Sequence, residues 1–446
     1  MTGAGEWTFK LKEVSAFDLT EQAREFAEGQ RAICGASPDP NVRVYPRFTS
    51  QQPLYGRVSF ADRTAEPAPR TTYRLALDES KGTGQGYDRL YFDRNQDGDL
   101  TNDKVLPARA NPAPGATLNY TGISQVCFEN LAVPLAFGSQ GERLLEMMPR
   151  LLLWQEGDKG ITFVTTQARQ GRIRLAGGKY DVLLGHNQVA AGWFDHPWTA
   201  LHLMPAGSRS RPRWMGSNRL MALHKIDGTF YQFAATPAGD KLTVRPYTEP
   251  LGVFEVGAGA RTIEGVNIHG SLRTRNTTVG VGEVSRDYRL SLAHSPVQTC
   301  ELPADDYMPE YLTLEFGKLR MTISNNYHTD GRRMHIVGRQ WVYGIHIRPD
   351  QPFVLDFSNP PAVMFVSPAR DCRIKPGEEL RVMAVLTDPV LDIMFRRLQD
   401  TSEQCQETLV EGQPYRSLHT DVSLDPKVVI RRANGEIVAE GVMPFG

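Results

Sequence analysis

Apolar and polar residues alternate along most of this chain with a period of two, the pattern of a β-strand with one buried face. One stretch differs, because Leu19, Ala23 and Phe26 follow Asp18 at helical spacing and Gly29 ends the run. The pattern predicts a mostly β protein with one short N-terminal helix. The predicted strands are short and lie between Gly and Pro residues, for example at 42–44, 54–60, 73–77, 151–154, 161–165 and 179–184.

Three pairs of these runs surround dipeptides that favour tight turns, and each pair is predicted to form a hairpin. A two-residue loop also fixes the register, so that apolar side chains of both strands lie on the same face. The turn residues are Asp227-Gly228, Gly317-Lys318 and Asn434-Gly435, and the paired strands are 224–226 with 229–231, 312–316 with 319–323, and 428–432 with 436–439.

The chain has 446 residues, which is enough for three or four domains of ordinary size. We expect tandem β-sandwich domains at 1–135, 136–258, 259–357 and 358–446. From Pro360 the sequence resembles an immunoglobulin-like module, with a first strand at 363–366, an alternating strand at 380–386 and the Asn-Gly hairpin. Little sequence follows that hairpin. A truncated module, a small module and a module completed by a strand from a partner all remain open.

The most informative stretch is Asp93-Arg94-Asn95-Gln96-Asp97-Gly98, in which three oxygen-bearing side chains alternate and a glycine follows at once. Ca²⁺ is bound by six to eight hard oxygen ligands, and side chains at loop positions 1, 3 and 5 converge only if position 6 makes a sharp turn. Glycine makes that turn without steric cost. We therefore predict Ca²⁺ as the cofactor of a loop at 93–104, with the ligands Asp93, Asn95, Asp97, Asp99, Thr101 and Asp103.

The rest of the loop departs from the EF-hand pattern. Lys104 stands at position 12, where an EF-hand has a bidentate Glu. The residues before Asp93 are predicted as a strand, and Pro107 argues against a long helix after the loop. The stretch resembles the wider group of EF-hand-like and dockerin-like calcium loops, and the chain resembles large exported bacterial proteins of unknown function that carry such loops between strands. An acidic surface turn without an ion is the alternative.

Composition narrows the classes of partner. The formal net charge of −1 provides no field to attract nucleic acid, and no apolar run approaches the length of a membrane helix. The first residues show no signal peptide, so they are a cytoplasmic start or the start that remains after a signal has been removed. The five cysteines are widely spread and form no C-x-x-C motif, so buried free thiols are expected for most of them, with Cys372 and Cys405 as the one candidate pair.

No catalytic motif with Ser, His or Cys is present. The region richest in aromatic and His residues contains Trp193, His196 and Trp198, which together could stack against a sugar. The alternative is a loop whose Trp side chains pack on a sandwich. The primary hypothesis is a calcium-stabilised, non-enzymatic, extracytoplasmic protein with a structural or adhesive role at the cell surface. Its alternatives are a protein that binds or acts on carbohydrate such as a cell-surface glycan, and a self-associating filament subunit completed by strand exchange.

Overall fold

The computed structural model describes residues 5–443, apart from 16–28, 62–69, 84–85, 111–122, 137–140, 155–158, 176, 186–192, 198, 208–218, 259–260, 263–266, 275–277, 282–298, 325–342, 368–371, 374, 376, 379–381, 389, 392 and 406–419. Thirty-two strands make up the regular structure of these residues, and no helix occurs among them. The prediction of a mostly β protein is confirmed. The helix predicted after Asp18 lies outside the described residues.

The first unit is a nine-stranded antiparallel sheet with the order β7-β6-β5-β4-β3-β11-β10-β8, in which β9 also pairs with β10. A β-bridge between Ala108 and Phe128 joins the two ends of this order, so the sheet curves back on itself around one apolar core. Its strands are β3 (Gly29–Gly35), β4 (Leu54–Ala61), β5 (Arg70–Asp78), β6 (Arg89–Phe92), β7 (Leu106–Pro107), β8 (Ile123–Cys127), β9 (Leu131–Ala136), β10 (Glu142–Trp154) and β11 (Lys159–Thr165).

The second unit is a sandwich of two four-stranded sheets, β1-β17-β16-β15 and β14-β13-β12-β2. The N-terminal segment contributes one strand to each sheet, and Leu11 between those strands is buried in the shared core. The strands are β1 (Trp7–Lys10), β2 (Lys12–Ser15), β12 (Gln167–Leu175), β13 (Gly178–Gly185), β14 (Ala200–Pro205), β15 (His224–Ile226), β16 (Thr229–Ala235) and β17 (Lys241–Pro246).

The third unit packs the sheet β19-β18-β22, joined by β26, against the sheet β21-β20-β23-β24-β29-β28-β27, joined by β25 and β30. Its strands are β18 (Leu251–Ala258), β19 (Arg261–Thr262), β20 (Asn267–Arg273), β21 (Thr278–Val281), β22 (Thr299–Pro303), β23 (Asp306–Phe316), β24 (Leu319–Ser324), β25 (Ile345–His346), β26 (Phe353–Asp356), β27 (Ala362–Ser367), β28 (Met383–Asp388), β29 (Ile393–Cys405) and β30 (Thr420–Ser423).

The immunoglobulin-like module expected at the C-terminus is not confirmed. Strands β27 to β30 extend the sheet of the third unit, because β29 pairs directly with β24. The last two strands, β31 (Lys427–Arg431) and β32 (Ile437–Val442), form a sheet of their own. The predicted division at 357/358 therefore falls within one continuous sheet, and the division at 135/136 falls within the β9–β10 hairpin.

The three predicted hairpins are present. Asp227 and Gly228 both have positive φ angles, 46° and 79°, as the type I′ turn between β15 and β16 requires. Gly317 has a φ of 59° between β23 and β24, where Phe316 pairs with Leu319. These local turns agree with the sequence because their geometry depends on two residues only.

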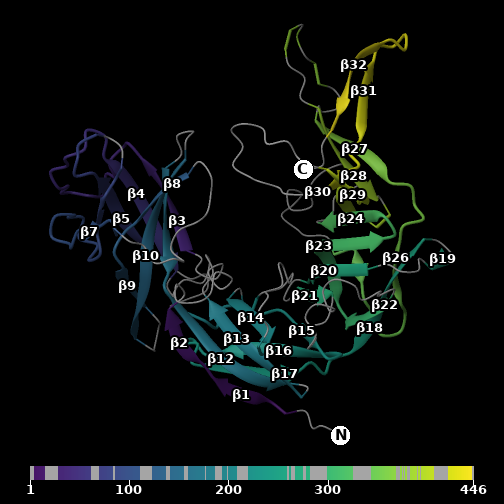
Figure 1. Ribbon diagram of the computed structural model, residues 1–446, viewed down its shortest axis with the longest axis horizontal. Helices are drawn as coiled ribbons and strands as arrows, with labels where there is room; N and C mark the ends of the chain where they lie inside the picture. The colour runs from purple at the N-terminus through teal and green to yellow at the C-terminus, as the bar shows by residue number, and fades with distance from the viewer. Residues whose placement is uncertain are drawn as a thin grey trace.

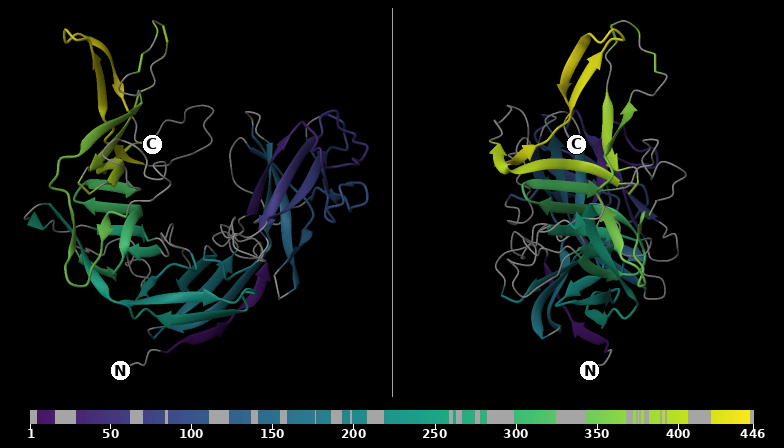
Figure 2. Two further views of the ribbon diagram at one scale, coloured as in Figure 1. Left: turned by 180° about the vertical axis from the view of Figure 1, so that it is seen from behind. Right: turned by 90° about the vertical axis from the view of Figure 1, so that its right-hand side faces the viewer.

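The three units follow one another along an open arc, and the β31–β32 hairpin extends from the end of the third unit (Figures 1 and 2). Buried contacts join the neighbouring units. Trp193 of the second unit belongs to the core of the first, and Leu223 and Phe230 of the second belong to the core of the third. These contacts fix each joint by the same apolar burial that stabilises the units themselves.

Candidate metal site

Asp93 directly follows strand β6 of the first unit. The three residues before it, Leu90, Tyr91 and Phe92, are buried, and the backbone N–H of Asp93 donates to the carbonyl of Arg74 on β5 at 2.9 Å. This hydrogen bond continues the β5–β6 ladder by one residue. The Asp93 side chain is fully buried as a result. The prediction that a strand leads into the loop is confirmed, and β7 follows the loop.

The far side of the loop is anchored by Leu100 and by the segment around Val44. Leu100 is fully buried in a small cluster with Val42 and Tyr91, and its N–H donates to the Val44 carbonyl at 3.0 Å. The N–H groups of Arg43 and Val44 donate to the Gly98 carbonyl at 2.7 and 3.1 Å. Gly98 has a φ of 76°, and a Cβ there would lie 3.0 Å from a backbone oxygen. Only glycine makes this turn without strain.

Between these anchors, successive oxygen-bearing side chains accept hydrogen bonds from backbone N–H groups farther along the loop. Asp93 accepts from Gly98 at 3.2 Å, Asn95 from Asp97 at 3.1 Å, Asp97 from Asp99 at 2.8 Å, and Asp99 from Thr101 at 2.8 Å. These are the local bonds that Asn and Asp side chains make in turns. They hold the carboxylate and amide groups along one tight loop.

Asp103, at loop position 11, closes the loop where an EF-hand uses position 12. Its Oδ2 accepts a hydrogen bond from the backbone N–H of Arg94 at 3.1 Å, which brings the carboxylate back to the start of the loop. Lys104 instead forms an ion pair with Glu129 at 3.1 Å. The lysine at position 12 therefore lies apart from the aspartates.

The carboxylates of Asp93, Asp97 and Asp103 affect one another's pKa values. Burial, followed by the charge of Asp97, raises the pKa of Asp93. Burial, followed by the charges of Asp93 and Asp97, raises the pKa of Asp103. The hydrogen bond from Asn102, followed by that from the Asp99 backbone, lowers the pKa of Asp97. Two of the three carboxylates are thus less stable as anions than in water, which is the situation that a bound cation relieves.

The residues fit a Ca²⁺ ion in one decisive respect. Asp93 Oδ1 is buried and has no hydrogen-bond partner among the residues that the structure describes. Buried carboxylate oxygens are normally satisfied, so an unsatisfied one at loop position 1 indicates a ligand position. Asp93 stands with Asn95 and Asp97 in the hard-oxygen donor set that Ca²⁺ prefers.

Binding requires local rearrangement. No three His, Cys, Asp or Glu side chains in the described part of the chain converge closely enough to hold a metal ion as they stand. Asp97 Oδ2 accepts from the amides of Asn95 and Asn102 at 3.0 and 2.7 Å. These amide N–H groups partly compensate the Asp97 charge and would turn away to admit an ion. Asn102 lies within the predicted loop at 93–104 but was not among its predicted ligands.

The second predicted group of residues is not arranged as an open binding surface. Trp193 is 5% exposed and belongs to the core of the first unit, with its ring centroid 6.4 Å from that of His196. Trp198 lies outside the described residues. The buried ring of Trp193 matches the alternative in which this tryptophan packs against the sheets. Carbohydrate binding by this region stays a prediction.

Comparisons of the chain with known protein families, with curated proteins and with solved structures found no match. Among the described residues, no helix is long and apolar enough to cross a membrane. Cys34, Cys127, Cys300 and Cys372 are free thiols, of which Cys34 and Cys127 are buried as expected and Cys372 is exposed.

Proposed function

We propose that this protein is a non-enzymatic, calcium-stabilised structural protein that acts outside the cytoplasm, at the cell surface. The observation that supports the calcium site most strongly is the buried Oδ1 of Asp93, which has no hydrogen-bond partner among the described residues. The loop at 93–104 supplies the remaining donors as hard oxygen atoms on a fixed turn. An ion there would neutralise Asp93, Asp97 and Asp103 together.

The weak calcium affinity expected of this loop supports an extracytoplasmic location. The loop lacks the bidentate carboxylate that an EF-hand has at position 12, and we expect a site without that ligand to bind calcium in the range of ~10⁻⁵ M and weaker. Extracellular modules use such sites because calcium is abundant outside the cell. A dissociation constant of ~10⁻⁵ M in ~1 mM calcium would stabilise the first unit by about 2.7 kcal/mol.

The joints between the units support a structural role. Phe194 is fully buried between two arginines from different units, with the Arg143 guanidinium 5.8 Å and that of Arg169 5.0 Å from its ring centroid. At the other joint, Arg219 forms an ion pair with Glu310 at 3.3 Å. Apolar and charged contacts at both joints would hold the three units in a defined arc. Such an arc suits a spacer better than a hinged enzyme.

The test is thermal unfolding of the full chain in about 1 mM calcium, in the same concentration of magnesium, and in chelator. We expect calcium to raise the melting temperature and magnesium to have a much smaller effect, because Mg²⁺ requires near-ideal octahedral geometry. Identical melting curves in calcium and chelator would contradict the proposal.

A further inference from the structure

The β31–β32 hairpin exposes an unusual amount of apolar surface. Every residue of β32 is exposed, which means that both faces of the strand are accessible. An isolated two-stranded hairpin is at best marginally stable in water, and apolar side chains on both of its faces add to the cost. The exposed apolar residues of the hairpin are Val429, Ile430, Ile437, Val438 and Val442, with exposed fractions of 42, 38, 47, 56 and 60%.

Neither outer edge of this hairpin pairs with another strand among the residues that the structure describes. Within the part of the chain that the structure describes, β31 pairs only with β32, and β32 only with β31. Natural sheet edges are usually blocked by proline, inward-pointing charge or a covering segment. Strand β32 contains Glu440 as its one charged residue and has no proline. Each edge therefore offers unpaired backbone N–H and C=O groups to another strand.

The two edges differ in charge in a complementary way. Strand β31 carries Lys427 and Arg431, whereas β32 carries Glu440. Neither Lys427 nor Glu440 has an ion-pair partner among the described residues. Val429 lies opposite Glu440 in the hairpin register, which shifts by one residue between Ile430 and Arg431. Lys427, Val429 and Arg431 alternate along β31, so they share one face of the strand.

The register predicts which residues would face each other if a second hairpin paired edge to edge with the first, without a shift along the strands. Glu440 of one copy would lie opposite Val429 of the next, with Lys427 as its diagonal neighbour on the same face and Arg431 just beyond the register shift. Diagonal neighbours across two strands are ~7–8 Å apart, within reach of long side chains. All strands of the combined sheet would run antiparallel, because each hairpin repeats the direction of the one before it.

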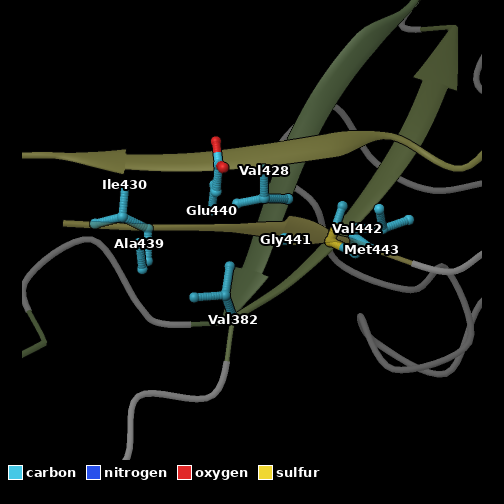
Figure 3. Close-up of a pocket in the computed structure, with 8 residues that line it drawn as sticks. All are labelled: Val382, Val428, Ile430, Ala439, Glu440, Gly441, Val442 and Met443. Carbon is cyan, nitrogen blue, oxygen red and sulfur yellow. The ribbon is translucent and has the colours of Figure 1, made fainter. Parts of the chain in front are cut away.

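A shallow apolar hollow of about 310 Å³ lies beside the hairpin. Val428 and Ile430 of β31, Ala439 and Val442 of β32, and Val382 line it (Figure 3). The five exposed apolar side chains of the hairpin and this hollow form one continuous apolar surface at the end of the third unit. An exposed apolar surface of this kind commonly marks a contact with another protein.

We propose that the hairpin is the docking site for a second copy of this chain, and that β32 of one copy pairs with the outer edge of β31 of the next. A second copy fits because the acidic edge and the basic edge that complement each other belong to the same chain. The contact is head-to-tail, so repeated addition produces a chain of subunits that does not close by itself. This proposal goes beyond the calcium site and does not depend on it.

The first experiment is sedimentation velocity of the full chain over about a hundredfold range of concentration, in calcium and in chelator. We expect the mean mass to rise with concentration in both solutions, with species larger than a dimer. A chain that stays monomeric throughout overturns the proposal and assigns the hairpin to a different partner. A mass that stops at the dimer overturns the head-to-tail arrangement.

Charge reversal tests the arrangement more sharply. Glu440→Lys makes both edges basic, and Lys427→Glu with Arg431→Glu makes both edges acidic. Each variant alone should associate at least about tenfold more weakly than the wild type, because like charges meet at the contact. An equimolar mixture of the two should recover association, because each basic edge then meets an acidic one. If the mixture stays monomeric while each variant keeps its wild-type melting temperature, the proposed pairing is wrong.

The matched control is Ile33→Lys on β3, which adds charge to a side chain that is 80% exposed in the first unit. This variant should associate as the wild type does. Val438→Lys on β32 should abolish association instead. Equal loss of association in Ile33→Lys and Val438→Lys would show that the effect is non-specific and would overturn the proposal.

Discussion

Replacing Asp93 by Asn should change stability in opposite directions with and without calcium. The substitution preserves the shape of the side chain and removes its charge. In chelator, the ionised Asp93 is disfavoured by burial and by Asp97, as the raised pKa of Asp93 indicates. The neutral amide avoids that cost and can donate to the neighbouring carboxylates. We expect Asp93→Asn to be neutral or to stabilise the calcium-free protein by up to about 1 kcal/mol.

In calcium the same substitution removes the ligand at loop position 1. If calcium is present at ~100 times its dissociation constant, the wild type gains about 2.7 kcal/mol and the variant gains almost nothing. The first unit spans Gly29–Thr165. At ~2.1 cal/mol/K per residue over about 140 residues, its unfolding entropy is about 0.3 kcal/mol/K. The wild type should therefore melt about 9 °C higher in calcium than in chelator, and Asp93→Asn at almost the same temperature in both.

The assay is differential scanning calorimetry of both proteins in calcium and in chelator. Glu129→Gln is the charge-matched control, because Glu129 is close enough to pair with Lys104 but is not a predicted ligand. That control should keep the full calcium shift. The reasoning is refuted if Asp93→Asn responds to calcium as the wild type does, or if Glu129→Gln loses the response equally.

Four further outcomes are expected. Burial raises the pKa of Asp93 and Asp103, so protons compete with calcium, and the calcium-induced rise in melting temperature should shrink as the pH is lowered from neutral in paired melting curves. Burial lowers the pKa of His224 from 6.5 to about 4. Because the unfolded chain binds a proton at this residue more readily than the folded one, the wild type should lose about 3 kcal/mol of stability as the pH falls from 6.5 to about 4. Denaturant titrations of His224→Gln should show a flatter pH profile than those of the wild type. Leu100→Ala should cost ~2–4 kcal/mol and also weaken calcium binding in titration calorimetry, because Leu100 anchors the loop. Phe194→Ala should cost ~3–5 kcal/mol and broaden the distance distribution from small-angle X-ray scattering; an unchanged distribution would show that this joint does not fix the arc.

The features that the sequence predicted correctly depend on short-range geometry. Asp227-Gly228 specifies its turn because both residues adopt positive φ without strain, and the two strands beside it follow. The strand before Asp93 is likewise visible as a short apolar run, Leu90-Tyr91-Phe92. Such features need only a few consecutive residues, and the sequence contains them in full.

The features that the sequence did not predict depend on pairing between distant segments. Nothing local indicates that Ala108 and Phe128 join the two ends of the first sheet, or that the N-terminal strands pair with β17 and β12. The division at 357/358 was placed by strand patterning that resembles an immunoglobulin-like module, whereas β24 and β29 pair across it. Strand periodicity identifies which residues face a core but not which core they face.

The same distinction applies to the candidate site. The alternation of Asp93, Asn95 and Asp97 marked the loop, but only the structure places Asp103 against the backbone of Arg94 and pairs Lys104 with Glu129. Trp193 illustrates the opposite case. Its aromatic neighbourhood suggested a ligand surface, and the chain fold instead buries the ring between two units. Burial of a single aromatic side chain depends on the packing of distant elements, which periodicity does not report.

Equilibrium dialysis of the metal-stripped chain against radioactive calcium tests the central claim most directly, because it counts bound ions without reference to stability. The account predicts that each wild-type chain retains at least one Ca²⁺ at ~1 mM free calcium, and that Asp93→Asn retains one ion fewer. Equal retention by the two proteins, or no retention by the wild type, would contradict it.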